Sequence, residues 1–283
     1  MGLIREIVLV DCPDEVGLIH RITGVLQDRG LNIESNHEFV DAATRHFFFR
    51  AEVTQAAPPT AGGPLAAGLA RVLPATARIR VTRVDRRPIV VCATREPHCV
   101  GELLLLDAIG ELPGRIAAVV SNHDLLRGLV ERFGVAFHHV PVLGDDREAH
   151  EAALTAAIDA HAPEYVVLAR YMRVLSEPFI ARYPERIVNI HHSFLPAFAG
   201  ASPYRQAFAR GVKLIGATAH FVTAELDAGP IIAQDVIPVD HAFTAERMAQ
   251  AGSDVEKLVL ARAVRLVLEE RVFLHGGRTV VFG

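Results

Sequence analysis

Two polar side chains stand where a strand is expected to end. In "NIHHSFLPAF", residues 189–198, Asn189 and His191 follow the apolar run "RIV" of residues 186–188. Alternate side chains of an extended chain project to the same side, so Asn189 and His191 face together, while His192 faces packing or solvent. An amide donates hydrogen bonds, and an imidazole exchanges protons near neutral pH. The spacing therefore predicts that Asn189 and His191 share one substrate.

A carboxylate stands in a second polar stretch. "ATAHFVTAELDAGPII", residues 217–232, carries His220 on a predicted strand and Asp227 in the loop before the next strand. We expect a tight turn there, because Gly229 permits a positive φ and Pro230 restricts the backbone. Taken alone, an aspartate that accepts backbone N–H groups in a turn is commoner than a catalytic one. A catalytic role for Asp227 requires that this loop meet the end of the other strand.

The second part of the chain alternates between strand and helix patterns. Strands are expected at 89–94, 115–121, 137–142, 165–169 and 186–190, helices near 98–110, 124–133, 147–160 and 176–183, a β pair at 213–222 and 230–239, and a terminal helical region at 245–274. Alternation of this kind predicts parallel strands with crossover helices, a Rossmann-like doubly wound, mostly parallel α/β sheet. Ligands of such sheets gather beyond the carboxyl ends of the strands, where Asn189 and His191 stand.

The first part of the chain has a different pattern. Strands at 4–10, 31–41, 45–53 and 77–84 and helices at 16–30 and 65–73 give a βαββαβ, ferredoxin-like order, with Gly30 ending the first helix and a loop at 54–64. The pattern restarts after "DRRP". We therefore expect an N-terminal domain at 1–84, a linker at 85–88 and a second domain at 89–283.

Composition excludes several classes of protein. The chain has 283 residues, of which 51% are hydrophobic and 22% charged, and no apolar run approaches the length of a membrane span. The net charge of −4 is spread along the chain, so no nucleic-acid surface and no membrane partner are expected. The three cysteines, Cys12, Cys92 and Cys99, form no disulfide framework, which favours the cytoplasm.

Several segments together resemble one known family. "NIHHSFLPAF", "YMRVL", "GATAHFV" and "LDAGPIIAQD" resemble the formyltetrahydrofolate-dependent formyltransferase superfamily and, within it, the formyltetrahydrofolate deformylases. "HCVGELL", "NHDLLRGLVERF" and "AGSDVEKLVLARA" fit the same family, and the resemblance covers essentially the whole chain. It implies that residues 1–84 form an ACT-type regulatory and oligomerisation domain and that residues 89–283 form a catalytic domain with the formyltransferase fold.

The resemblance implies an enzyme that hydrolyses 10-formyltetrahydrofolate to formate and tetrahydrofolate, which supplies formate and balances the folate pools of purine biosynthesis. The implied catalytic residues are Asn189, His191 and Asp227. Asn189 would stabilise the oxyanion, His191 would donate to the same oxygen or protonate nitrogen, and Asp227 would position water and take its proton. The sequence does not decide how the last two share the proton transfers.

Further residues are implied as folate contacts. The backbone around Arg173 to Leu175 would hydrogen-bond the pterin ring, and Leu226 to Gly229 would line the other side of an apolar slot. His98, Cys99 and His220 would approach the formyl group. The full set of expected substrate contacts is Met172, Arg173, Val174, Leu175, His220, Leu226, Gly229, His98 and Cys99. No metal and no permanently bound cofactor are expected.

An alternative is formyl transfer to an amine such as glycinamide ribonucleotide. A phosphorylated acceptor needs an anion cradle, commonly glycines at a helix N-terminus after the first strand. Here that place reads "REPHCVGELL", with Pro97, His98 and Cys99, and proline has no N–H to donate. The sequence therefore favours water as the acceptor.

The resemblance also implies regulation through the ACT-type domain. Such domains pair across subunits and bind a small amino acid, here methionine or glycine, so a homo-oligomer, a dimer or tetramer, is expected. The matching candidates are Asp14, Gly17, Leu18, Asn32 and Ile33. A dimerisation module without a ligand is an equal alternative, and a non-catalytic amino-acid and folate sensor is a second alternative function for the whole chain.

Two other site chemistries fit the sequence poorly. No HxxxH or HExxH spacing occurs, and His191 and His192 project to opposite sides of an extended chain, so a metal site is not expected. A serine hydrolase built on Ser193 or Ser202 is also disfavoured, because "GASPY" lacks the second glycine of GxSxG.

Overall fold

The computed structural model describes residues 4–55, 64–142, 144, 146–196 and 203–283. Contacts divide the chain into two units, Met1–Asp85 with Phe282–Gly283, and Arg86–Val281. None of the helices in the described ranges has the length and apolar character that crossing a bilayer requires.

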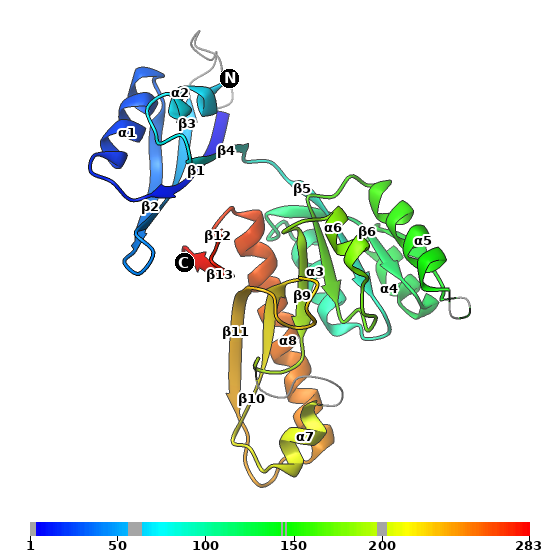
Figure 1. The fold of residues 1–283 in the computed structure, drawn as a ribbon. Coiled ribbons are helices and arrows are strands. Elements are labelled where there is room, and N and C mark those ends of the chain that lie inside the picture. The colour runs from blue at the N-terminus through cyan, green and yellow to red at the C-terminus, as the bar shows by residue number, and fades with distance from the viewer. Residues whose placement is uncertain (1–3, 56–63, 143, 145, 197–202) are drawn as a thin grey trace. The chain divides into compact units, whose positions relative to one another are not determined.

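The first unit is a four-stranded antiparallel sheet with two helices (Figure 1). Its elements are β1 (Ile4–Pro13), α1 (Leu18–Asp28), β2 (Asn32–Asp41), β3 (His46–Gln55), α2 (Leu65–Ala70) and β4 (Arg78–Arg83). The strand order is β2-β3-β1-β4, so the predicted βαββαβ, ferredoxin-like domain is confirmed. Gly30 has a φ of 67°, as expected for the residue that ends the first helix. Most of the predicted loop at 54–64 lies outside the described residues.

Alternate residues of the central strands build the core of the first unit. Val8, Val10 and Cys12 of β1 pack with Ile22 and Leu26 of α1. These side chains are 1% exposed or less, because the apolar positions of the helix recur on one face and those of the strand at every second residue. The two periodicities in the sequence therefore determine which faces meet.

The second unit is a seven-stranded, mostly parallel sheet with a small C-terminal hairpin. Its elements are β5 (Arg87–Ala93), α3 (His98–Ala108), β6 (Gly114–Ser121), the 3-10 helix η1 (Asp124–Leu126), α4 (Arg127–Arg132), β7 (Ala136–His139), α5 (Arg147–Asp159), β8 (Tyr165–Ala169), α6 (Glu177–Arg182), β9 (Ile187–His191), α7 (Pro203–Ala209), β10 (Leu214–Phe221), β11 (Ile231–Pro238), α8 (Ala245–Leu268), β12 (Val272–His275) and β13 (Arg278–Val281). The strand order is β11-β10-β9-β8-β5-β6-β7. The pairings from β7 to β9 are parallel, and β10 and β11 are antiparallel.

Helices cover both faces of this sheet, which confirms the predicted doubly wound α/β fold. Ile89, Val91 and Ala93 of β5 share a core cluster with α3, α4 and α8. Val90 and Cys92, the alternating residues, share another cluster with α5 and α6. Because β5 is buried on both faces, its sequence is a continuous apolar run rather than an alternating one.

Strand order reverses between β5 and β8. From β5 the chain proceeds to β6 and β7 on one side and later returns to β8 and β9 on the other. Loops diverge beyond the carboxyl ends of the strands at such a switch point and leave a crevice. The loop after β8 and the end of β9, which contain candidate site residues, lie next to this crevice.

The C-terminal region corrects one expectation. The helical region predicted for 245–274 ends at Leu268, and residues 272–281 form the hairpin of β12 and β13. Gly276 and Gly277 have φ values of 56° and 74°, which suits the two central residues of a tight hairpin turn. The apolar residues of β12 were assigned to the helix because a short apolar run has no period that separates helix from strand. Helix α7 was also not predicted.

The predicted linker at 85–88 is shorter than expected, because β5 begins at Arg87. Arg87 is 8% exposed, and its Nη1 lies 2.6 Å from Oε1 of Glu270, which is 2% exposed. Arg87 also donates to the carbonyl of Leu268. Two arginines before a proline are typical of an exposed segment, but Arg87 is buried because it pairs with Glu270. The sequence did not predict this pair, because Glu270 is almost two hundred positions away along the chain.

We predict that Arg87→Met lowers the free energy of unfolding of the second unit by about 3–5 kcal/mol, because it removes the cation from a buried carboxylate. The double variant Arg87→Met, Glu270→Leu should recover most of this loss, since both charges are then gone. Urea denaturation of the full chain measures both. A single substitution that costs no more than an exposed pair, about 0–1 kcal/mol, would contradict the prediction.

Candidate active site

Strand β9 presents Asn189 and His191 at its end. Val188 and Ile190 point into the core with α8, so Asn189 and His191 lie on the opposite face of the strand. His191 is 6% exposed. The predicted alternation is therefore seen for these two residues, and both line the same cavity.

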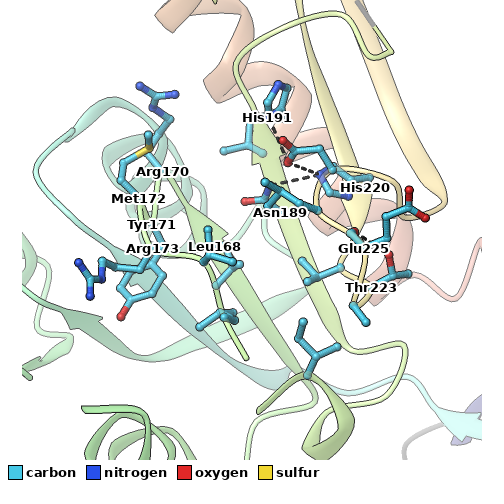
Figure 2. A pocket seen from close by; sticks show the side chains of 18 of the residues that line it. Leu168, Arg170, Tyr171, Met172, Arg173, Asn189, His191, His220, Thr223 and Glu225 are labelled. Atoms are coloured by element: carbon cyan, nitrogen blue, oxygen red, sulfur yellow. Dashed lines mark hydrogen bonds and ion pairs between the residues drawn. The ribbon is translucent and has the colours of Figure 1, made fainter. Parts of the chain in front are cut away.

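The neighbouring strand β10 places His220 beside Asn189. The two residues are register partners, and Nδ2 of Asn189 lies 3.2 Å from Nε2 of His220 (Figure 2). Nδ1 of His220 lies 2.8 Å from the carbonyl of Phe221, which only accepts, so Nδ1 carries the proton. Burial lowers the pKa of His220, so the neutral ring accepts from Asn189 through Nε2. The second N–H of the Asn189 amide remains available to a substrate oxygen.

Asp227 reaches the end of β9 from the loop between β10 and β11. Its Oδ1 lies 3.2 Å from Nδ1 of His191 and 3.9 Å from Nε2 of His220. His191 donates to this carboxylate through Nδ1, and its other nitrogen, Nε2, is buried without a hydrogen-bond partner among the described residues. Asn189, His191 and Asp227, which are separated by up to 38 positions along the chain, thus meet at one place.

The predicted turn at Asp227 forms for a different reason than expected. Asp227 itself has the positive φ, 55°, and Gly229 does not. A Cβ on Gly229 would lie 1.7 Å from the carbonyl oxygen of Phe221, so glycine is required there by close approach of the backbone. Asp227 tolerates the left-handed conformation better than most residues, because short polar side chains hydrogen-bond locally.

The electrostatics keep this carboxylate ionised. The hydrogen bond from His191 lowers the pKa of Asp227, against the opposing effect of partial burial. A carboxylate whose pKa is lowered in the folded protein stabilises the fold above its ordinary pKa, and that contribution is lost as the pH falls through the lowered value. At neutral pH Asp227 is therefore a carboxylate that accepts the hydrogen bond of His191.

The sequence predicts that His192 lies on the opposite side of the strand from His191, and this prediction is wrong. Strand β9 ends at His191, and the chain bends at His192, so the two rings lie 5.2 Å apart. Burial, together with the charge of Arg170, lowers the pKa of His192 to about 4. His192 is therefore neutral at pH 7 and packs between His191 and Tyr204, whose ring is 6.1 Å from its own.

A cavity of about 500 Å³ opens beside these residues. Its walls are mostly apolar and come from β8, the loop after β8, β9 and the loop before β11. Figure 2 shows Asn189, His191 and His220 on one side and Arg170, Met172 and Arg173 on the other. Met172, Val174 and Leu226 are 56%, 61% and 64% exposed and line the same cavity, so together they form an apolar surface that a ligand could cover.

The loop after β8 is held by polar side chains. Thr94 accepts from the N–H of Met172 at 3.0 Å, and Arg147 donates to the carbonyl of Val174 at 2.8 Å. The N–H of Arg173 donates to the carbonyl of Tyr171. Two of the backbone groups expected to bind a heterocycle are thus already engaged within the protein, although a carbonyl can accept a second hydrogen bond.

Most expected substrate contacts line the cavity, and three do not. Met172, Arg173, Val174, Leu175, His220 and Leu226 line it, whereas His98, Cys99 and Gly229 are not among its lining residues. Nε2 of His98 lies 2.9 Å from Oε2 of Glu256. Cys99 is fully buried, and burial with nearby carboxylates raises the pKa of its thiol well above the ordinary value. Cys99 is therefore a protonated packing residue.

Among the described residues, His98, Cys99 and Glu256 form one group of possible metal ligands, with ligand atoms within 4.8 Å of one another. Nε of Arg170 lies 3.4 Å from Oε2 of Glu256, so the guanidinium group already balances the charge of this carboxylate. A thiol with a raised pKa is also a poor ligand, since metals bind the thiolate. The donor set therefore does not fit a metal ion.

Of the two serines considered as nucleophiles, the structure describes Ser193. Ser193 is 4% exposed, and its carbonyl accepts from Thr218 at 2.9 Å. Ser202 lies outside the described residues.

The candidate regulatory residues form two groups at opposite ends of the first unit's sheet: Asp14, Gly17 and Leu18 follow the end of β1, and Asn32 and Ile33 begin β2. Gly17 precedes α1 with a φ of 89°, and Asp14 pairs with Arg45 at 3.3 Å. Leu18 is 3% exposed and belongs to the core, so a ligand would meet only its backbone. Asn32 is exposed and donates to Glu34 at 2.9 Å.

The sequence analysis missed Arg170. It follows β8 directly, lines the cavity and has a φ of 60°, a strained value for a residue other than glycine. Its position immediately after the buried strand "YVVLA" was a signal, because ligands bind beyond such strand ends. Its ion pair with Glu256 was not visible in the sequence.

Comparison with known proteins identifies both units. Residues 87–264 match the formyl transferase family, and residues 7–61 match the ACT domain family. The chain is 50% identical over 277 residues to the formyltetrahydrofolate deformylase of Haemophilus influenzae, covering 98% of this chain and 99% of that protein. It is 51% identical over 280 residues to that of Escherichia coli K12, covering 99% of each.

Solved structures give the same result. A formyltetrahydrofolate deformylase from Pseudomonas syringae matches with a TM-score of 0.94 at 40% identity, covering 100% of this chain and 95% of that one. A glycinamide ribonucleotide transformylase from Symbiobacterium toebii matches with a TM-score of 0.67 at 35% identity, covering 70% of this chain and 95% of that one.

We predict that Gly229→Ala raises the pKa of Asp227 toward its ordinary value. The added Cβ collides with the backbone at Phe221, so the loop must shift and Asp227 loses the hydrogen bond from His191. Carboxyl NMR titration of the full chain measures the change. Ala228→Ser, at an exposed neighbouring position, is the control and should leave the titration unchanged. An unchanged pKa in Gly229→Ala would show that the close approach does not position Asp227.

Proposed function

This chain belongs to the formyltetrahydrofolate deformylase family, and we propose that Asn189, His191 and Asp227 catalyse its reaction. The protein is an enzyme that hydrolyses 10-formyltetrahydrofolate to formate and tetrahydrofolate. In this reaction water attacks the planar formyl carbon, the bond from that carbon to N10 breaks, and N10 takes up a proton. The formate and the free folate return to the one-carbon pools on which purine biosynthesis draws.

One observation carries the assignment of the residues. The hydrogen bond between His191 and Asp227, 3.2 Å long, lies beside Asn189 at the wall of an apolar cavity large enough for a flat heterocycle. A donor, an imidazole and an ionised carboxylate are the groups that hydrolysis of an amide requires. Formyl transfer to an amine would use the same three groups, so the choice of water as acceptor rests on the relatives, which are formyltetrahydrofolate deformylases.

Asn189 is proposed to stabilise the oxyanion. Negative charge develops on the formyl oxygen as water attacks, and the amide of Asn189 has one N–H that His220 does not use. His220 acts as a positioning residue, because its tautomer determines which way the Asn189 amide points. A fixed donor aimed at the developing charge contributes more than one that must reorient during the reaction.

His191 and Asp227 are proposed to handle the protons as a pair. The lowered pKa of Asp227 keeps it ionised but makes it a weak base by itself, and His191 donates to it through Nδ1. The pair accepts the proton of the attacking water and returns a proton to N10, so no net proton remains on the enzyme.

The folate is proposed to lie in the cavity between the loop after β8 and the loop before β11. Met172, Val174 and Leu226 cover its apolar faces, and the backbone around Arg173 to Leu175 meets the polar edge of the pterin. No permanently bound cofactor and no metal take part in this proposal. Cys12, Cys92 and Cys99 are free and buried, which suits a reducing compartment, so we place the enzyme in the cytoplasm.

The ACT domain is proposed to bind a small amino acid, methionine or glycine, and to pair across subunits of a homo-oligomer. Asp14, Gly17 and Leu18 lie at the start of α1, and Asn32 and Ile33 lie at the start of β2, at the other end of the same sheet. Exposed donors at the start of α1 suit the carboxylate of an amino acid. The identity of the amino acid is open between these two.

We predict that the purified protein releases formate from 10-formyltetrahydrofolate without any acceptor and without loss on addition of a chelator. The reaction is run with and without glycinamide ribonucleotide, since a protein of similar fold bears the name of a transformylase of that compound. Formyl transfer with no formate release would contradict hydrolysis. No product in either reaction would favour the non-catalytic amino-acid and folate sensor.

The catalytic residues are tested by Asn189→Ala and Asp227→Asn. We expect kcat to fall about 10²–10³-fold for Asn189→Ala and about 10²–10⁴-fold for Asp227→Asn, with KM little changed because the folate cavity is intact. Steady-state formate release measures both constants. Exposed Glu225→Gln, which also lines the cavity rim but lies outside the trio, is the matched control for loss of a carboxylate. Wild-type rates in Asp227→Asn would remove it from the mechanism.

We also predict that methionine and glycine change the rate of formate release and that Gly17→Ala abolishes the response without changing the basal rate. Alanine at a φ of 89° is strained, so the start of α1 must rearrange. Rates are measured over a range of each amino acid, and light scattering gives the subunit number. An effector response that Gly17→Ala leaves intact would place the effector elsewhere.

A further inference from the structure

A buried carboxylate lies close to the catalytic trio and takes no part in the mechanism proposed above. Glu256 on α8 is 1% exposed. Oε2 lies 2.9 Å from Nε2 of His98 and 3.4 Å from Nε of Arg170, and Oε1 accepts from the hydroxyl of Tyr204 at 2.6 Å. We call Glu256 with His98, Arg170 and Tyr204 the buried carboxylate cluster.

The cluster ties four separate elements together. His98 begins α3, Arg170 follows β8, Tyr204 lies on α7 and Glu256 lies on α8. Burial acts to raise the pKa of Glu256, but the hydrogen bonds from His98 and Tyr204 and the charge of Arg170 outweigh it and lower the pKa. An ionised carboxylate in this position is tolerated only because each of its oxygens has a partner.

Glycine on α8 makes room for the cluster. Gly252 stands one turn before Glu256, and a Cβ there would lie 2.1 Å from the Tyr204 ring and hydroxyl. The Tyr204 ring therefore lies directly on the helix backbone. Any larger residue at 252 would push it away from Glu256.

The cluster reaches the cavity through Arg170 and lies next to His191 by way of His192. His192 lies between His191 and Tyr204, with ring separations of 5.2 Å and 6.1 Å, and both His192 and Arg170 line the cavity. The proposed folate walls, by contrast, are formed by residues 172–175 and 222–226. A nucleophile larger than water needs space next to His191, and His192 with Tyr204 and Glu256 behind it fills that space.

The charge around the cluster also opposes an anionic acceptor. Burial and the charge of Glu256 raise the pKa of Cys99, the charge of Arg170 lowers it, and Glu102 and Glu96 raise it further, so three carboxylates and one arginine act on the first turn of α3. Pro97 precedes this turn and has no N–H. Negative charge and a missing donor make this helix start unsuitable for a phosphate, in contrast to helix starts that bind anions.

We propose that the buried carboxylate cluster determines specificity for water over an amine acceptor, by filling the space beside His191 through which an amine would reach the formyl carbon. The inference rests on the proposed function. In the excluded reaction an amine nitrogen attacks the formyl carbon, the bond to N10 breaks, and the proton that the amine loses goes to N10. The same trio serves this reaction equally well, so only access distinguishes the two outcomes.

The test opens the cluster while keeping Glu256 and Arg170 paired. The full-length double variant His98→Ala, Tyr204→Ala removes two side chains, and His98→Gln, Tyr204→Phe is the matched control that keeps their volume. Each protein receives 10-formyltetrahydrofolate with glycinamide, a small amine without phosphate. Formate and N-formylglycinamide are quantified by mass spectrometry in the same reaction.

We expect the opened variant to raise the ratio of N-formylglycinamide to formate by about tenfold or more over the wild type, since removing side-chain bulk from a pocket commonly changes discrimination by that factor. The control should keep the wild-type ratio. An opened variant that still hydrolyses the folate but shows the wild-type ratio would overturn the inference, as would a control that transfers as well as the opened variant.

A second variant guards against loss of the fold. Gly252→Ala adds one methyl group that displaces the Tyr204 ring from α8, and it should raise the same ratio, whereas Gly252→Ala in a Tyr204→Ala background should add nothing further. An unchanged ratio in Gly252→Ala that retains a native melting transition would count against the inference. If the wild type releases no formate, the proposed function itself fails; if it does and no variant formylates glycinamide, only the cluster's role fails.

Discussion

The hydrogen bond from His191 to Asp227 is the interaction on which the proposed catalytic arrangement depends, and it exists because the loop between β10 and β11 brings Oδ1 of Asp227 within 3.2 Å of Nδ1 of His191 at the end of β9. The approach is possible only where the backbone at Gly229 passes the carbonyl of Phe221 without a Cβ between them. Asp227 accepts a left-handed conformation to complete the turn. The close approach of the backbone at Gly229 therefore determines where the Asp227 carboxylate lies, and the hydrogen bond from His191 lowers its pKa.

The doubly wound sheet supplies the rigid support for this hydrogen bond. β8 and β9 are buried on both faces, so their ends are fixed by packing rather than by the loops that follow them. The buried pairs of the second unit, Arg87 with Glu270 and Arg170 with Glu256, are each confined by several elements. An unpaired buried charge strongly destabilises the fold, so each of these side chains is held in the position where its partner pairs with it. The loop after β8 is anchored at one such pair and carries the proposed folate contacts.

A formyltransferase fold that performs hydrolysis shows that fold and reaction are separate properties. In the proposed mechanism, the trio acts on the formyl group in a way that does not depend on the identity of the nucleophile. The proposed difference between water and an amine lies in the surroundings of His191, where packed side chains and carboxylates leave room for water. In this view the acceptor is selected by exclusion, because no group of the protein needs to bind water specifically for hydrolysis to prevail.

Local patterns in the sequence determined the fold class and most of the trio. Periods of two and 3.6 residues predicted the strands and helices of both units, and the family motifs pointed to Asn189, His191 and Asp227, which the structure brings together. The short apolar run of β12 was misassigned because it has no distinguishing period. Tertiary structure alone decided the burial of Arg87, the bend at His192, the exclusion of His98 and Cys99 from the cavity, and the pairing of Arg170 with Glu256. These depend on partners far apart in the chain, and a local pattern carries no information about which distant charge will be buried beside it.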